Sequence, residues 1–354
     1  MPISLLRINN FRNLAEVELH PNQQGLNIIC GDNASGKTSL LEAIYYLSLA
    51  RSFRTATASR LIQHSADYFS LFCQLVSNNG LSPIGIKRHL NGDSQIRISE
   101  KDITATTELA YFLPLRLMNS HSHYLVEEGP ALRRKYLDWG IFYQSESFSP
   151  CWRQFERALK QRNAILRDKK PKKELDIWTI ELIKYGTQLD QLRRDYVQKL
   201  LPFLTSIIAE LITLPSLEIV YQPGWNESQN ISQLLTEKYA DEYRTGYTQW
   251  GPHRADLHIT INQIPVRYLL SRGQQKLLTC AMIVAQGNLL NNCTNKALTY
   301  LVDDLPSELD AQSKTKLLSL LTKQETQVFI TAIEHSPMTA SKMFHVKHGH
   351  VEEI

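Results

Sequence analysis

Several features that restrict the location or the chemistry of a protein are missing from this sequence of 354 residues. Its cysteines include no C-x-x-C pair; they are Cys30, Cys73, Cys151, Cys280 and Cys293. Closely paired cysteines are typical of zinc sites and disulfide frameworks, so this pattern argues against both and for a reducing compartment. No apolar run approaches the roughly 20 residues of a membrane helix, and the N-terminus lacks the regions of a signal peptide. We therefore expect a cytoplasmic protein without a membrane partner.

A strong excess of charge of either sign is also absent. The formal net charge is +4 and the isoelectric point is near 8.7, which does not by itself indicate binding to nucleic acid. Low-complexity segments and internal repeats are missing as well. The length is sufficient for a large core and for two structural units.

The clearest chemistry lies in a glycine loop near the N-terminus. The pattern G-x-x-x-x-G-K-[ST] is matched in full by Gly31, Asp32, Asn33, Ala34, Ser35, Gly36, Lys37 and Thr38, and Ser39 follows it. An apolar run at 26–30 predicts a buried strand before the loop, and residues 38–49 predict a helix after it. In this context the loop amides bind phosphates, Lys37 reaches the terminal phosphates, and Thr38 can ligate magnesium. The motif predicts a nucleoside triphosphate and Mg²⁺, but not what the triphosphate is used for.

The segments on either side of this loop predict further strands. Residues 3–8 are expected to form an edge strand, and Arg12 lies in the polar turn that follows. Because this turn precedes the phosphate loop by one strand, Arg12 is a candidate second contact for the nucleotide; the alternative is a surface turn. Residues 70–76, 84–89 and 95–98 predict an antiparallel layer beside the main sheet.

The most regular pattern occupies the middle of the chain. Apolar and aromatic residues alternate at spacings of three and four at Leu175, Trp178, Leu182, Tyr185, Leu189, Leu192 and Tyr196. This heptad seam, and a similar one that begins with Trp152, Phe155 and Leu159, predict two antiparallel helices that form a short arm. Pro202 is expected to end or kink the second helix.

Positive charge is concentrated in the same arm. Residues 153–173 contain nine lysines or arginines and two acids, a net charge of +7, so that the rest of the chain has a net charge of −3. A solvated helix face would explain this concentration. Binding of the phosphate backbone of DNA would explain it equally well.

The C-terminal part contains further patterns that suit a nucleotide site. Ser271 is a candidate N-cap for an apolar helix at 277–290, and Gly273 would let a phosphate approach the backbone there. A buried strand at 297–302 ends in Asp303 and Asp304. The first acid would coordinate magnesium through water, and the second would orient or deprotonate the attacking water.

The order of these patterns is more specific than any one of them. After Asp304 come Ser307, Glu308, Leu309 and Asp310, and then a strand at 327–331 with a hydroxyl at its tip. Phosphate loop, S-x-G-Q helix, strand with two acids, S-x-L-D and strand with a hydroxyl follow one another in this order in ABC-type ATPase heads. In such heads ATP lies between two subunits, which implies a nucleotide-dependent homodimer and catalytic roles for Lys37, Ser271 and Asp304. A small-molecule kinase needs neither the S-x-G-Q helix nor S-x-L-D, and an ABC transporter subunit has no role for the arm.

The whole chain resembles the RecF family of bacterial recombination and repair ATPases, which is related to SMC heads. The resemblance rests on residues 10–13, 31–38, 133–138, 251–254, 271–275 and 303–310. There are two departures: residues 119–123 replace a Pro-Glu-Asp loop, and Ala255 stands where an acid is usual.

This resemblance implies an α/β fold in which an ABC-type P-loop ATPase head, a mixed sheet with an antiparallel layer, carries an inserted helical arm. We expect residues 1–128 and 216–354 to form the head and residues 129–215 to form the arm. The resemblance also implies a weak DNA-dependent ATPase that dimerises on ATP and binds single-stranded and gapped DNA. Such a protein works with RecO and RecR to load RecA, maintains replication forks and takes part in the SOS response. The departures predict slow or differently coupled ATP turnover.

Overall fold

The computed structural model describes all residues except 78–79, 295, 297, 305–308, 324–325 and 333–340. The chain forms two compact units, one made of Met1–Ser122 with Leu290–Ile354 and the other of His123–Leu289. The boundaries therefore fall at 122/123 and 289/290 instead of the expected 128/129 and 215/216. Residues 216–289, which we had expected in the ATPase head, belong to the same compact unit as the arm.

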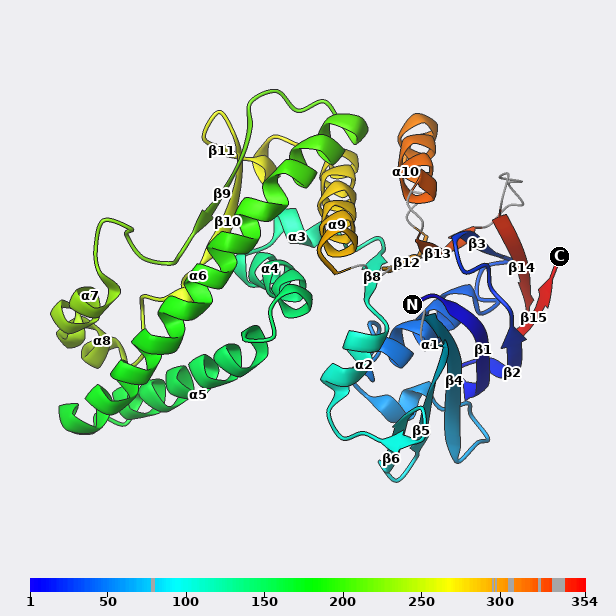
Figure 1. The fold of residues 1–354 in the computed structure, drawn as a ribbon, viewed down its shortest axis with the longest axis horizontal. Helices are drawn as coiled ribbons and strands as arrows, with labels where there is room; N and C mark the ends of the chain where they lie inside the picture. Colours follow the sequence, from blue (N-terminus) through cyan, green and yellow to red (C-terminus); the bar gives the residue numbers. More distant parts are fainter. Residues whose placement is uncertain (78–79, 295, 297, 305–308, 324–325, 333–340) are drawn as a thin grey trace. The chain divides into compact units, whose positions relative to one another are not determined.

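One sheet of the first unit positions the phosphate loop (Figure 1). Its strand order is β15-β14-β3-β13-β12-β8, and the strands are His350–Glu353, Ser341–Lys347, Gly25–Cys30, Gln327–Ala332, Thr299–Val302 and Leu115–Met118. Strands β3, β13 and β12 are parallel neighbours and almost completely buried, as expected for a parallel sheet covered on both faces. Because parallel strands end at the same edge, the residues after β3, β12 and β13 meet there.

The second sheet of this unit is antiparallel and has the order β2-β1-β4-β5-β6-β7. Its strands are Leu14–Leu19, Ile3–Phe11, Tyr68–Ser77, Gly80–His89, Ser94–Ile98 and Lys101–Asp102. The predicted antiparallel layer is thus confirmed. The prediction that residues 3–8 form an edge strand is wrong, because β1 pairs with both β2 and β4.

Helix α1 (Lys37–Leu49) connects the two sheets of the first unit through a common core. Its Leu40, Leu41, Ile44 and Leu47 are completely buried, in one cluster with side chains of both sheets. Phe11 of β1 packs edge-on against Phe69 of β4 at 5.1 Å between ring centroids. The unit is completed by α2 (Thr106–Phe112), α10 (Ala311–Lys323) and the short 3₁₀ helix η1 (Ala58–Leu61).

The second unit contains the predicted arm, formed by α5 (Phe148–Arg167) and α6 (Lys172–Leu211). The other helices are α3 (Tyr124–Glu127), α4 (Pro130–Gln144), α7 (Ile231–Glu237), α8 (Tyr239–Thr245) and most of α9 (Arg272–Thr294). A small antiparallel sheet has the order β11-β10-β9, with strands Ile264–Pro265, Asp256–Ile261 and Leu217–Gln222. The short 3₁₀ helices are η2 (Pro252–Arg254) and η3 (Val266–Tyr268).

The heptad seam was predicted correctly in α6 and incorrectly at the start of α5. In α6, four of the seven predicted seam residues are buried, namely Leu175, Leu182, Leu189 and Tyr196. The other three, Trp178, Tyr185 and Leu192, are half-buried. In α5, Phe155 is buried, but Trp152 is 40% exposed and Leu159 is half-buried, because the buried face of the helix runs through Phe148, Cys151, Phe155 and Ala158. Helix α6 also continues through Pro202 to Leu211, where four later side chains are buried: Leu204, Ile207, Ile208 and Leu211. Their burial offsets the hydrogen bond that proline cannot make.

A buried ion pair joins the arm to α8. Arg162 of α5 is 1% exposed, and its guanidinium donates to Glu242 Oε2 at 2.6 Å, to Thr248 Oγ1 at 2.8 Å and to Thr179 Oγ1 at 2.9 Å. One of the nine basic residues of the arm is therefore neutralised inside it. The other eight basic residues of this segment are exposed.

Removing this pair tests the packing of the arm. Arg162→Ala would leave Glu242 buried without its partner, and we expect the free energy of unfolding to fall by about 3–5 kcal/mol. The measurement is urea denaturation followed by circular dichroism. Arg153→Ala, an exposed change on the same helix, should alter it by less than about 0.5 kcal/mol. Equal effects of the two changes would contradict the buried pair.

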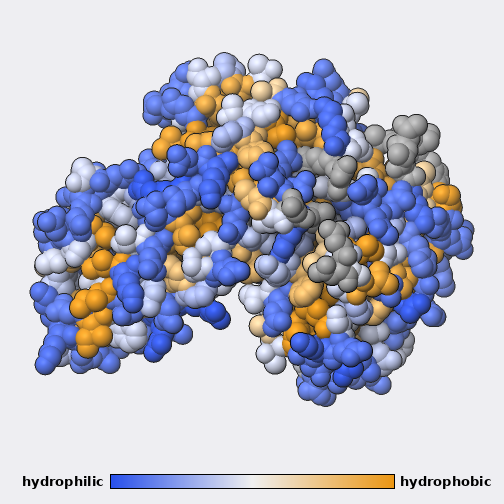
Figure 2. Space-filling view, viewed as in Figure 1, coloured by the Kyte–Doolittle hydropathy of each residue, from blue (hydrophilic) through white to orange (hydrophobic). Residues whose placement is uncertain are grey.

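In the face shown in Figure 2, hydrophilic residues predominate and hydrophobic residues form separate groups among them. Within the described part of the chain, no helix combines the length and the apolar character needed to cross a membrane.

Candidate functional site

The glycine loop connects β3 to α1 as the sequence predicts. Gly31 has φ +145° and Gly36 has φ +125°, a backbone conformation that residues with a Cβ atom rarely adopt. A Cβ at Gly31 would lie 2.2 Å from the carbonyl oxygen of Val346 in β14. The loop therefore needs glycine at this position both for its conformation and for the close approach of β14.

Lys37 lies within the curve of this loop. It is only 6% exposed, and its Nζ donates to the carbonyl oxygens of Gly31 at 2.7 Å and Asp32 at 3.0 Å. The Ser35 hydroxyl is buried and has no hydrogen-bond partner among the described residues. An ammonium and an unpartnered hydroxyl in a loop at a helix N-terminus are groups that can bind phosphate oxygens.

Thr38 and the two acids after β12 meet at the sheet edge. Thr38 Oγ1 donates to Asp303 Oδ1 at 3.1 Å. Thr331, at the tip of β13, lies 3.2 Å from the same carboxylate oxygen, and its hydroxyl accepts from the Asp304 amide at 2.8 Å. The structure thus brings together groups that are 265 residues apart in the chain.

Electrostatics favour a cation beside Asp303. Burial raises the pKa of Asp303, and the Asp304 carboxylate raises this pKa further, while hydrogen bonds from Thr38 and Thr331 oppose the shift. A bound cation would stabilise the ionised form. Hydroxyl and carboxylate oxygens are the ligands that Mg²⁺ prefers, so Thr38 and Asp303 fit this ion. No three metal-ligating side chains cluster among the described residues, so phosphate and water would complete the coordination.

Arg12 lines the same cavity, but a second residue holds it there. The cavity has a volume of about 560 Å³ and is lined by Arg12, Asn13, Asn33, Ala34, Gly36, Lys37, Thr38, Ser39, Arg54, Arg60, Ile62 and Asp304. Arg12 donates to both oxygens of Glu42, at 2.9 and 2.8 Å, and Arg54 Nη1 lies 3.5 Å from Glu42 Oε2. The sequence analysis missed Glu42, a fully buried carboxylate of α1. Its signal was a lone charge within the apolar stretch 40–47.

Asn13 ties the turn after β1 to the glycine loop. Its Nδ2 donates to the Ser35 carbonyl at 3.0 Å, and its Oδ1 accepts from the Ser39 hydroxyl at 2.9 Å. The Gly349 amide donates to the same Ser35 carbonyl at 3.1 Å. Two other segments of the first unit, at Asn13 and at Gly349, therefore fix the shape of the loop.

The predicted S-x-G-Q helix begins with a capping box in the second unit. Ser271 Oγ accepts from the Gln274 amide at 3.3 Å, and Gln274 Oε1 accepts from the Ser271 amide at 3.0 Å. Ser271 is exposed, and nothing lies within 4 Å of a Cβ built on Gly273. The helix starts at Arg272, five residues before the predicted start at 277. This helix end is open to a ligand or to a second copy of the chain.

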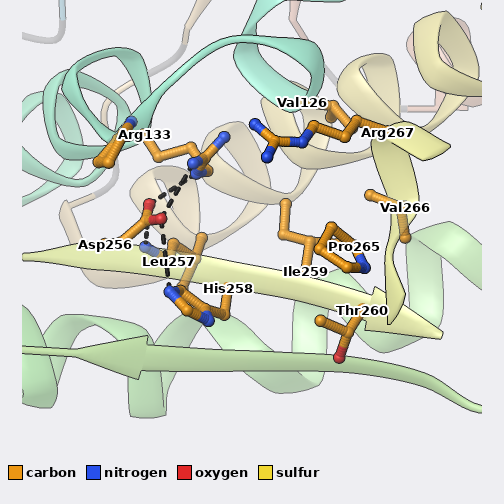
Figure 3. Close-up of a pocket in the computed structure, with 11 residues that line it drawn as sticks. Val126, Arg133, Asp256, Leu257, His258, Ile259, Thr260, Pro265, Val266 and Arg267 are labelled. Atoms are coloured by element: carbon orange, nitrogen blue, oxygen red, sulfur yellow. Dashed lines mark hydrogen bonds and ion pairs between the residues drawn. The ribbon is translucent and has the colours of Figure 1, made fainter. Parts of the chain in front are cut away.

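Two other motif segments have structural contacts in the second unit (Figure 3). Arg133 donates to both oxygens of Asp256, at 2.6 and 3.0 Å, and His258 lies 3.5 Å from the same carboxylate. They line a cavity of about 270 Å³, to which η3 contributes Arg267. The acid after Ala255 therefore pairs with the arginine of the earlier motif and joins α4 to β10.

A second ion pair, between Asp138 and Arg193, joins α4 to α6. Arg193 is 3% exposed and donates to both oxygens of Asp138 at 2.8 and 2.9 Å, and to the Pro252 carbonyl at 2.6 Å. Nearby, burial lowers the pKa of His253 to about 4, so this histidine is neutral at pH 7. These motif residues stabilise the second unit through buried contacts.

Ser307 and Glu308 of the S-x-L-D pattern lie outside the described residues. Asp310 accepts from the Ser313 amide at 2.9 Å and from its hydroxyl at 2.6 Å, at the start of α10. At the departure over 119–123, Asn119 and Ser122 form a polar turn closed by a 2.8 Å hydrogen bond.

Comparison with known proteins gives full-length matches. The family model described as RecF/RecN/SMC N terminal domain matches residues 2–352. A protein of Shewanella denitrificans named "DNA replication and repair protein RecF" is 42% identical over 100% of both chains. A protein of Shewanella halifaxensis with the same name is 41% identical and covers 100% of this chain and 98% of its own.

Solved structures agree with these matches. The structure of the recombination mediator protein RecF with ATPrS, in the RecFOR pathway, has a TM-score of 0.86 and 28% identity, and the match covers 100% of this chain and 98% of that one. The SMC head bound to the C-terminal winged-helix domain of ScpA has a TM-score of 0.65 at 14% identity, over 100% of this chain and 97% of that one. This second likeness shows the fold alone. Together the matches confirm the predicted α/β ATPase head with its antiparallel layer.

Proposed function

Because the chain belongs to the RecF/RecN/SMC N-terminal domain family, we propose that it is a DNA-binding ATPase of recombinational repair and replication-fork maintenance. The observation that carries the proposal is that Lys37, Thr38 and Asp304 line one cavity, while the Thr38 hydroxyl donates to Asp303. Positions far apart in the chain converge there on the groups that an ATP–Mg²⁺ complex needs.

Each residue of the site has a proposed role in binding or hydrolysis. The backbone of residues 31–39 and the Lys37 ammonium bind the phosphates, and Arg12, positioned by Glu42, contacts the nucleotide as a second cation. Thr38 and Asp303 hold Mg²⁺, which when bound neutralises charge on the phosphates. Asp304 orients the attacking water and accepts its proton.

The exposed start of α9 supports a composite site in an ATP-dependent homodimer. We propose that Ser271 and Gly273 of one copy bind the nucleotide held by another copy. Both residues are accessible at a helix N-terminus, where backbone amides favour anions. ATP would then join two heads, and its slow hydrolysis would separate them.

The positive charge of the arm supports DNA as a partner, although fewer of its basic side chains are available for DNA contacts than the sequence suggests. Arg162 is buried, and Lys169 donates to the carbonyl oxygens of Tyr243 and Arg244. Lys160, Lys170 and Lys173 of this segment remain for phosphate contacts. We further propose that the protein binds single-stranded and gapped DNA, works with RecO and RecR to load RecA, and takes part in the SOS response.

One experiment distinguishes the proposed DNA-binding, ATP-dependent dimer from the alternative function, an ABC-type ATPase subunit of another assembly. Binding of single-stranded, duplex and gapped DNA is measured with and without ATP, in parallel with sedimentation velocity. We expect ATP to shift the protein to a dimer and to raise DNA affinity. Failure to bind any DNA would favour the other assembly.

Ser271→Arg is the matched variant for this experiment. The side chain would fill the open helix start and place a cation where phosphate binds, so ATP affinity should persist while dimerisation and hydrolysis fall by at least about tenfold. Ser319→Arg, an exposed change on α10 of the first unit, is the control. A fully active, dimeric Ser271→Arg protein would contradict the composite site.

A further inference from the structure

A second basic cavity of the first unit adjoins the nucleotide cavity. It has a volume of about 540 Å³, and we refer to it as the arginine cavity because Arg51, Arg54 and Arg88 line it together with Tyr46, Phe53 and Thr55. Arg54 also lines the nucleotide cavity. The two cavities are therefore neighbours that share one guanidinium.

Three arginines line the arginine cavity, and one of them, Arg54, is paired with Glu42 at 3.5 Å. None of the described residues that line the cavity carries a carboxylate. The nearby Glu42 carboxylate already accepts two hydrogen bonds from Arg12 and one from the Ser52 hydroxyl. Arg51 is exposed and makes no hydrogen bond or ion pair with any residue that the structure describes. Three guanidinium groups around one carboxylate-free cavity favour an anion there.

The wall of the cavity is held in shape before any ligand binds. The Ser52 hydroxyl accepts from the backbone amides of Arg54 at 2.9 Å and Thr55 at 3.0 Å. The Phe53 ring packs edge-on against Tyr45 at 5.2 Å between centroids. A half-buried aromatic ring beside guanidinium groups is an arrangement on which a nucleic acid base can stack while its phosphate is bound.

We propose that the arginine cavity binds the phosphate backbone of a nucleic acid strand, with a base or sugar against Phe53. This inference rests on the proposed function, in which the protein binds DNA, and it assigns a contact to the first unit in addition to the arm. The volume exceeds that of a single phosphate ion, and the three guanidinium groups of the lining can pair with successive charges of one strand. Arg51 and Arg88 provide contacts that the nucleotide cavity does not use.

Arg54 and Glu42 give this site a physical connection to ATP. A phosphate that attracts Arg54 into the arginine cavity changes the pairing of Glu42, and Glu42 positions Arg12 in the nucleotide cavity. Binding of the strand and binding of ATP should therefore affect each other by the same factor.

The test uses the double variant Arg51→Ala, Arg88→Ala and a labelled single-stranded oligonucleotide. We expect affinity at 100 mM salt to fall on the order of tenfold, and the slope of log affinity against log salt to decrease by about 1.4, the value for two lost contacts to a single strand. In the absence of DNA, the double variant should bind a fluorescent ATP analogue with the affinity of the wild type. Added DNA should raise the affinity of the wild type for this analogue but not that of the double variant. Arg51→Glu alone, an exposed change, should lower DNA affinity even if the double variant is unstable.

The matched control is Lys101→Ala, Lys316→Ala, which removes two exposed positive charges from the same unit. If the control and the double variant have equal salt slopes, the arginine cavity is not a nucleic acid site. A second outcome is that inorganic phosphate raises the melting temperature of the wild type but not of the double variant, while both proteins bind DNA equally well. The cavity would then bind a free anion, and the inference would be overturned. If the wild type itself binds no DNA, the proposed function fails instead.

Discussion

Replacing Lys37 by methionine is expected to abolish ATP binding at millimolar nucleotide and, with it, every ATP-dependent step. The Lys37 ammonium lies within hydrogen-bonding distance of two loop carbonyls and is almost inaccessible to solvent. Methionine has a similar length but no charge. In the ATP complex the ammonium would donate to phosphate oxygens, and two charge-assisted hydrogen bonds of roughly 1.5–3 kcal/mol each correspond to a loss of ATP affinity of more than about 100-fold.

This effect is measured by titration with a fluorescent ATP analogue and by sedimentation with ATP. Lys316→Met, on the exposed side of α10, is the control and should bind ATP and dimerise normally. An unchanged melting temperature without nucleotide would show that the Lys37→Met protein is folded. Normal ATP affinity in that folded protein would refute the assignment of the phosphate loop.

Asp304→Asn should leave ATP binding intact and slow hydrolysis by about 100- to 1,000-fold, within the range that a general base contributes. Asparagine has the same shape, and the backbone N–H of residue 304 can still donate to Thr331, so the loop geometry is retained. The side-chain amide of asparagine, unlike a carboxylate, cannot accept the proton of the attacking water. The dimer formed on ATP should then persist.

Single-turnover hydrolysis and the lifetime of the dimer after ATP removal measure this prediction. The control is Asp102→Asn, which removes a surface carboxylate of the same unit. Hydrolysis at the wild-type rate in the Asp304→Asn protein would exclude Asp304 as the base. A rate that falls together with ATP affinity would assign it to binding instead.

The fold could be predicted from the sequence because its patterns are local. The strand before Gly31, the helix after Lys37 and the acids after β12 each depend on a few adjacent residues, and their order along the chain identified the type of ATPase head. The seam of α6 was readable for the same reason, since a spacing of three and four residues describes one face of a helix.

What the sequence did not reveal depends on partners that are distant in the chain. Glu42 is buried because Arg12 and Arg54, from two other segments, approach it. Trp152 is exposed because the contact between α5 and α6, and not the pattern within α5, sets the buried face. Asp256, next to the departure at Ala255, pairs with Arg133, which is 123 residues away in the chain. The spacing of residues along the chain does not predict such pairs of distant residues.

The closure of the glycine loop by the last strands has a consequence for synthesis of the chain. Ser35 receives a hydrogen bond from Gly349, and β3 pairs with β14 over residues 341–345. A nascent chain on the ribosome therefore carries the complete G-x-x-x-x-G-K-T sequence for most of its translation with the Asn13 contacts but without those from Gly349 and β14. Nucleotide binding would begin only once residues 341–349 have emerged, so a chain that stalls before this point would not take up ATP. Premature termination would then yield inert fragments, unable to compete with finished molecules for dimer partners.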